Sequence, residues 1–256
     1  MDAMFSLIGP QAFAIAAAVA LVGGFVKGTV GFALPLVMMS GMAAFLPPEV
    51  ALAGLIGSVF LSNIWQALRQ GRRAAFETAL KHWRFGAIVL VGMTFSAQLL
   101  PLLPQTALLL ILGVPVSIFA VMQLAGLQIR VSPERRGRAE LGFGTVAGIL
   151  GGLSGVWGPP TVAYLLAIGT EKSEQVRVQG VVFFLGSLVL VAAHLQSGVL
   201  NAQTIPFSLA LIVPAMLGMW LGFKAQDRMN RDQFLRATLV VLLIAGLNLI
   251  RRGLIG

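Results

Sequence analysis

The stretch "GGFVKGTVGFALP", from Gly23 to Pro35, lies within a long apolar part of the chain. It holds four glycines, a proline and a lysine. Glycine and proline interrupt helices, because glycine costs backbone entropy and proline lacks the N–H group that a helix interior needs. A lysine among apolar residues is costly unless its ammonium group finds a partner. The stretch therefore predicts a broken helix that carries a buried charge.

The composition is that of a chain surrounded by lipid. Of its 256 residues, 57% are hydrophobic and only 11% are charged, against about 25% charged in soluble domains. The first apolar segment lacks the basic start and the cleavage site of a secretory signal, so we expect it to stay as a helix. Cysteine is absent and histidine occurs twice. We therefore expect no disulfide, no metal and no cofactor.

The charges are gathered in short segments between apolar runs. The net charge is +9, which in a soluble protein would suggest nucleic acid. Here the positive-inside rule explains it, because most basic residues fall in four predicted loops that we place in the cytoplasm: 69–84, 128–140, 169–177 and 224–233. His82 belongs to the first, and we expect it to be solvated. Segments 99–105 and 197–203 are uncharged and are placed outside, whereas Arg251 and Arg252 land outside against the rule.

The chain contains an internal repeat. A shift of 127 residues places Gly24 on Gly151, and "KGTVG" (27–31) on "SGVWG" (154–158). The basic segment 69–84 then aligns with the uncharged segment 197–203, so the two halves have opposite charge character. Opposite orientations in the bilayer follow, and inverted repeats are typical of secondary transporters.

The predicted fold is an all-α polytopic membrane protein made of two inverted-topology repeats. The first repeat is 1–128, a basic cytoplasmic linker is 129–140, and the second repeat is 141–256. Each repeat has about five helical segments and starts with a helical hairpin that glycine and proline break, at 5–46 and 141–168. The sequence leaves open whether these hairpins span the membrane or are re-entrant.

The paired breaks are the predicted substrate site, because broken helices expose backbone groups that can line a cavity. Within the apolar runs no acidic residue pairs with Lys27, so an anionic substrate could be its partner. The alternative is that Lys27 snorkels to the membrane surface. The predicted substrate-binding residues are Lys27, Gly28, Thr29, Gly31, Ser154, Gly155, Trp157, Gly158 and Pro159, and Asn63, Gln66 and His194 are weaker candidates for lining the pathway.

These paired motifs resemble the TauE/SafE family of sulfite exporters, also called the 4-toluenesulfonate uptake permease family. The resemblance rests on "GGFVKGTVGFALPL" followed by "LPPEVALAG", and on "GILGGLSGVWGPPTVAYLL" followed by a helix that ends "HLQSGVL". Lys27 departs from many members, which have small residues at its position. The resemblance implies transport of small sulfur-containing or organic anions across the bacterial inner membrane.

The expected function is transport of a small anion bound between the two broken hairpins. Export is favoured, because moving one negative charge out of a negative-inside cell gains about 2.3 kcal/mol per 100 mV. Proton-coupled uptake of an organic anion is the alternative. The expected partners are the anion and the lipid bilayer, and self-association into a homo-oligomer stays open.

Two other classes of function compete with transport. "GLSG" (152–155) matches the GxSG of intramembrane serine proteases, and Ser154 with His194 could form a nucleophilic pair. The motif is only one half of a duplicated break, so we expect the chain not to be an enzyme. A membrane scaffold without a pathway of its own is the other class, and the polar residues at both breaks argue against it.

Overall fold

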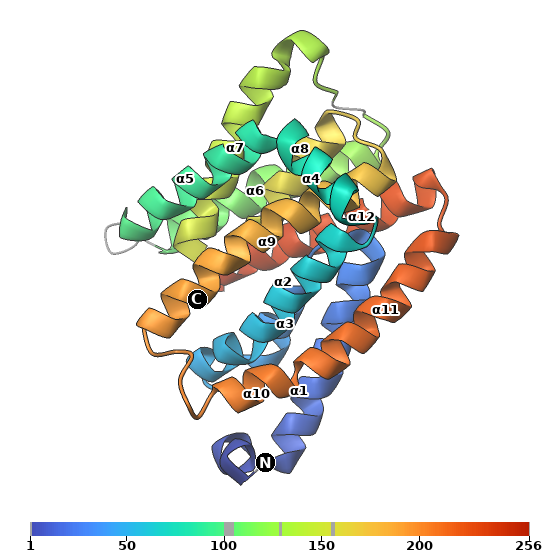
Figure 1. Ribbon diagram of the computed structural model, residues 1–256. Helices are drawn as coiled ribbons and strands as arrows, with labels where there is room; N and C mark the ends of the chain where they lie inside the picture. The colour runs from blue at the N-terminus through green and yellow to red at the C-terminus, as the bar shows by residue number, and fades with distance from the viewer. Residues whose placement is uncertain (1, 100–104, 128–129, 155–156, 256) are drawn as a thin grey trace. The chain divides into compact units, whose positions relative to one another are not determined.

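The computed structural model describes residues 2–99, 105–127, 130–154 and 157–255 (Figure 1). Throughout these ranges the regular structure is helical and contains no strand, which confirms the all-α prediction. Among the described residues, five helices are long and apolar enough to cross a bilayer, by length and composition: Ile8–Val30, Pro48–Leu68, Lys172–Gln196, Ile205–Arg228 and Arg231–Ile255.

The chain forms two compact units, and each takes segments from both halves of the sequence. The first unit is Met1–Arg69 with Phe183–Asn230, and the second is Gln70–Val182 with Arg231–Gly256. The first contains α1 (Asp2–Val30), α2 (Leu34–Met42), α3 (Pro48–Leu68), the end of α9 (Lys172–Gln196), α10 (Ile205–Ala210) and α11 (Ile212–Arg228).

The second unit contains the middle of the chain and its last helix. Its members are α4 (Arg72–Lys81), α5 (Trp83–Leu99), α6 (Gln105–Leu124), the 3-10 turn η2 (Pro133–Arg135), α7 (Arg136–Ser154), α8 (Gly158–Ala167), the start of α9 and α12 (Arg231–Ile255).

The two predicted hairpins each pair a long helix with a short one. α1 packs against α2, and α7 packs against α8. α2 has 9 residues and α8 has 10, so each is only about 14–15 Å long. The hydrocarbon core of a bilayer is about 30 Å thick, and neither short helix can cross it alone.

The charged segments predicted as loops are largely helical, and that part of the prediction is wrong. α4 occupies most of 69–84, and the ends of α7, α9, α11 and α12 extend through much of the other three segments. The residues that connect these helices are few, because the helices continue past their apolar parts and carry the charges on their terminal turns.

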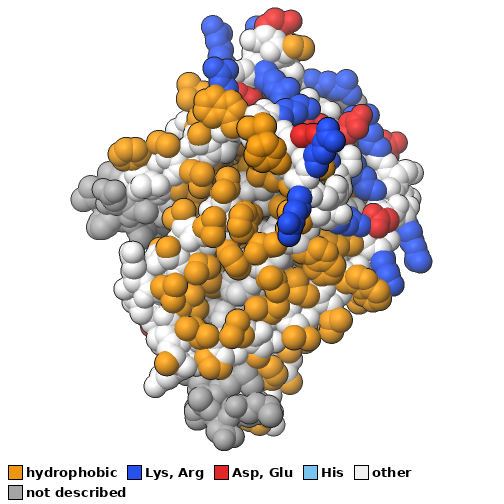
Figure 2. Space-filling model, in the orientation of Figure 1, with side chains coloured by type: hydrophobic (Ala, Val, Ile, Leu, Met, Phe, Trp, Pro, Cys, Tyr) orange, Lys and Arg blue, Asp and Glu red, His pale blue; other side chains and the backbone are white. Residues whose placement is uncertain are grey.

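α4 exposes large apolar side chains and buries polar ones. Its exposed side chains include Phe76 and Leu80, and Trp83 follows on the same stripe at the start of α5. Thr78 and His82, which are polar, are buried. Charged side chains of α4 are exposed as well, and a helix that exposes both kinds fits the boundary between lipid and water. Hydrophobic side chains cover much of the face in Figure 2, as expected for a membrane protein.

Glycines let long helices approach at backbone distance within each unit. In the first unit α1 packs along α11. A Cβ atom added to Gly24 would lie 2.0 Å from the Ala215 carbonyl oxygen. A Cβ atom added to Gly218 would lie 1.9 Å from the Leu21 carbonyl oxygen. In the second unit α5 packs along α7, where a Cβ atom on Gly148 would lie 2.7 Å from the Val89 oxygen. Such close crossings through small residues are common in membranes.

Replacing Gly218 by alanine should destabilise the protein, because the new methyl group would overlap the α1 backbone. Overpacking of this kind costs about 1–3 kcal/mol. Gly142→Ala is the matched control, since its Cβ atom would meet nothing within 4 Å and alanine favours a helix. Thermal unfolding in detergent should show a lower Tm for Gly218→Ala alone, and equal Tm values for both variants would contradict this packing.

Candidate functional site

The first helix break lies where the sequence predicts it. α1 ends at Val30, and Gly31 takes a φ of 91° with its N–H donating to the Lys27 carbonyl at 2.7 Å. Ala33 also has a positive φ, 76°, a region that residues with a Cβ atom rarely occupy. Pro35 fits the first turn of α2, where no N–H is needed. The chain reverses within three residues, and a strained backbone of this kind is typical of functional sites.

Two glutamine side chains hold the carbonyl groups at the end of α1. Gln66 on α3 donates through Nε2 to the Gly31 oxygen at 2.9 Å. Gln226 on α11 donates through Nε2 to the Thr29 oxygen at 3.1 Å. The last carbonyl groups of a helix have no partner within that helix, so these amides satisfy them in a buried setting.

Lys27 lies inside the first unit, and its side chain is only 2% exposed. Its ammonium group donates to Oδ1 of Asn63 on α3 and lies 5.9 Å from the centre of the Phe183 ring on α9. Asn63 in turn donates through Nδ2 to the Phe183 carbonyl at 2.9 Å. This burial argues against the snorkelling alternative, because a snorkelling lysine keeps its ammonium group in water.

The surroundings of Lys27 supply dipoles and a ring but no full negative charge. Within the part of the chain that the structure describes, no carboxylate forms an ion pair with Lys27. Lys27 is in the last turn of α1, where the carbonyl ends of the helix favour a cation. Asn63 provides a neutral side-chain partner instead.

The other candidates near the first break have local roles in the structure. Gly28 packs on α11, where a Cβ atom would lie 2.3 Å from the Met219 oxygen. The Thr29 hydroxyl donates to the Phe25 carbonyl within α1 at 2.8 Å. His194, near the end of α9, has Nδ1 at 3.5 Å from the Ser197 hydroxyl. It is not part of the Lys27 cluster, which consists of Lys27, Asn63 and Phe183. The structure thus brings together Lys27 and Asn63, and places Gln66 on the break beside them.

The second break lies in the second unit, between α7 and α8. Trp157 is buried and precedes α8, and Gly158 and Pro159 form the first turn of that helix. Ser154 is the last residue of α7, while its side chain and Gly155 lie outside the described residues. A Cβ atom on Gly151 would lie 3.1 Å from that of Trp157, so this tryptophan packs on the end of α7.

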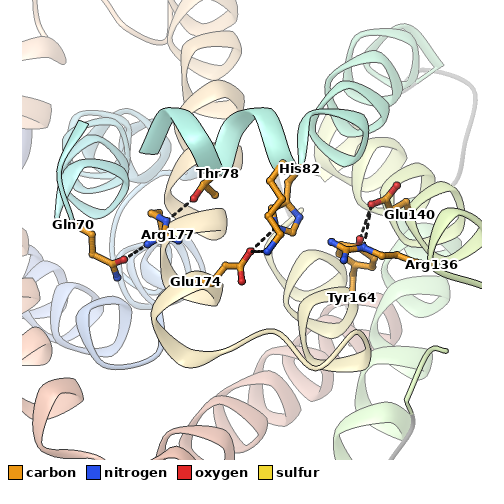
Figure 3. Close-up of polar contacts among 9 residues, drawn as sticks. Gln70, Thr78, His82, Arg136, Glu140, Tyr164, Glu174 and Arg177 are labelled. Atoms are coloured by element: carbon orange, nitrogen blue, oxygen red, sulfur yellow. Dashed lines mark hydrogen bonds and ion pairs between the residues drawn. The ribbon is translucent and has the colours of Figure 1, made fainter. Parts of the chain in front are cut away.

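A polar network in the second unit joins α4 to the start of α9 (Figure 3). Glu174 accepts from Lys81 at 2.6 Å and pairs with His82 Nε2 at 3.1 Å. Arg177 points between Thr78 and Gln70 and donates to both. The expectation that His82 is solvated is wrong, since this side chain is only 3% exposed. Burial lowers the pKa of His82.

Sequence reasoning missed two groups that complete the first site. Phe183 contributes a ring and a carbonyl group, and Gln226 contributes an amide. Both come from helices more than 150 residues after Lys27 in the sequence. An apolar phenylalanine gives no signal of its own, whereas a glutamine near the end of a membrane helix is polar enough to be considered.

Comparison with known families agrees with this architecture. The family model "Sulfite exporter TauE/SafE" matches residues 16–249, which is nearly the whole chain. The comparisons with curated proteins and with solved structures gave no match. Members of this family are multi-pass membrane transporters and not enzymes. Because the match covers nearly the whole chain, the chain belongs to the sulfite exporter TauE/SafE family.

Proposed function

We propose that this transporter carries sulfite or a related small sulfur-containing or organic anion, and that the anion binds at the first helix break with Lys27 as its counter-ion. The observation that carries the proposal is a buried ammonium group whose side-chain partner is a neutral amide, Asn63. The family match supports transport of such anions as a class.

The positive charge of the buried Lys27 ammonium group favours an anion over a cation or a neutral solute. Burying a charge costs several kcal/mol unless an opposite charge or good hydrogen bonds offset it. The Asn63 dipole and the end of α1 offset part of that cost, and an arriving anion would supply the rest. When the anion leaves, Asn63 can again accept from the ammonium group, so Lys27 keeps a partner throughout the cycle.

The proposed direction is export from the cytoplasm of a bacterium across its inner membrane. A negative-inside potential of 100 mV moves one negative charge outward with a gain of about 2.3 kcal/mol. Such an exporter needs no coupling ion. Uptake would need one, and proton- or sodium-coupled transporters commonly use a carboxylate within the membrane. The proposed cytoplasmic segments are 69–84, 128–140, 169–177 and 224–233.

The inverted repeat remains part of the proposal, and the packing within each unit supports it. The described helices follow the order long, short, long, short, long, long from α1 to α6, and again from α7 to α12. In the proposed repeat, Leu21 corresponds to Gly148 under a shift of 127 residues. Gly92 corresponds to Gly218 under a shift of 126 residues. Gly218 touches Leu21 in one unit and Gly148 touches Gly92 in the other, so equivalent positions make equivalent contacts.

Lys27→Met should lower the efflux of sulfite from proteoliposomes at least tenfold, because the counter-ion is lost. Its Tm should stay at or above that of the wild type, since methionine fills the space without a buried charge. Lys27→Arg should retain part of the flux. Lys224→Met is the control, because Lys224 is an exposed lysine of the same unit. Unchanged flux in Lys27→Met would overturn the proposed role of this lysine.

Single cysteines test the proposed sides of the membrane, because the natural chain has none. Glu77 on α4 and Ala202 before α10 are both exposed and belong to segments of opposite predicted side. A membrane-impermeant maleimide should label Glu77→Cys only in inverted vesicles and Ala202→Cys only in intact cells. Labelling of both from the same side would contradict the inverted repeat.

A further inference from the structure

The start of α9 buries two glutamine amides that the Lys27 cluster does not use. Gln175 is 1% exposed and Gln179 is 0% exposed, and both belong to the second unit. Among the described residues, the Nε2 atom of each amide has no hydrogen-bond partner, and neither does Oε1 of Gln179. An unsatisfied buried polar group destabilises a fold, so a methionine or leucine would be the more stable choice at Gln179.

The two amides share one face of the helix. Residues four apart on a helix have Cβ atoms about 5–6 Å apart, so the two NH₂ groups can reach oxygen atoms of one small anion. The charged residues on the same turns, Glu174 and Arg177, are engaged by α4 instead (Figure 3). The amides are therefore not part of that network.

Thr238 on α12 belongs to the same unit and is a further buried hydroxyl group. The Lys172 ammonium group, at the start of α9, lies 5.8 Å from the centre of the Phe234 ring on α12. Thr238 is one turn beyond Phe234, is 0% exposed, and has a hydroxyl group without a partner in the described structure. The start of α9 therefore contacts the start of α12 through Lys172 and Phe234.

We propose that Gln175 and Gln179 bind the transported oxoanion by donating their amide N–H groups to its oxygen atoms. This inference rests on the proposed transport of anions and adds a second position for the anion, in the second unit. Amide donors carry no net charge, so they can offset the loss of hydration without holding the anion as tightly as a buried lysine would. A weak neutral position suits a substrate that has to leave.

The test measures sulfite flux and thermal stability of the full chain in proteoliposomes and in detergent. Gln179→Met should lower the flux at least tenfold and raise the KM for sulfite, while its Tm stays equal to or rises above that of the wild type. Gln175→Met should act in the same direction. Gln196→Met is the matched control, because Gln196 is an exposed glutamine on the same helix, and it should change neither quantity.

Each other outcome counts against the inference. Wild-type flux in Gln179→Met would show that the amide does not meet the anion. A lower Tm in that variant would show that the amide has a structural partner. If the wild type itself carries no sulfite or related anion, the proposed function fails and this inference fails with it. If the wild type transports sulfite and both glutamine variants transport it at the wild-type rate, the inference is overturned and the proposed function stands.

Discussion

The ammonium group of Lys27, buried in the turn that ends α1, is the constraint on which the first unit depends. A charge in that position requires an acceptor, and Asn63 provides one while its own amide is fixed by the Phe183 carbonyl. The broken backbone requires partners as well, and Gln66 and Gln226 supply them from two other helices. Three helices thus converge on one reversal of the chain, because each satisfies a polar group that lipid could not.

Close helix packing makes this convergence possible. Gly24 and Gly28 on α1 face Ala215 and Met219 on α11 at backbone distance, which brings Gln226 on the same helix to the end of α1. Gly24 and Gly28, four residues apart on α1, therefore position the proposed site and do not themselves need to touch a substrate. The same approach that packs α1 on α11 delivers an amide to the Thr29 carbonyl, so the packing of the first unit and the proposed site depend on the same residues.

The sequence predicts the parts of this arrangement that depend on local chemistry. A helix break within 23–35, the buried charge of Lys27 and the helical membrane fold all follow from residue types and their spacing. The pairing of Lys27 with Asn63 and Phe183 does not, because it joins helices far apart in the chain. The sequence predicts a cytoplasmic loop at 69–84, yet α4 forms there. The polar groups of Thr78 and His82 find partners in Arg177 and Glu174 of the same unit.

The central claim is that an anion moves as a net charge, with no proton or sodium ion bound beside it. Sulfite efflux from proteoliposomes, under a potential set by potassium and valinomycin with no proton or sodium gradient, tests it most directly. The account predicts that efflux accelerates when the inside is negative, slows when the sign is reversed, and does not change when a protonophore is added at a clamped potential. Efflux that ignores the potential, or that requires a proton or sodium gradient, would contradict it.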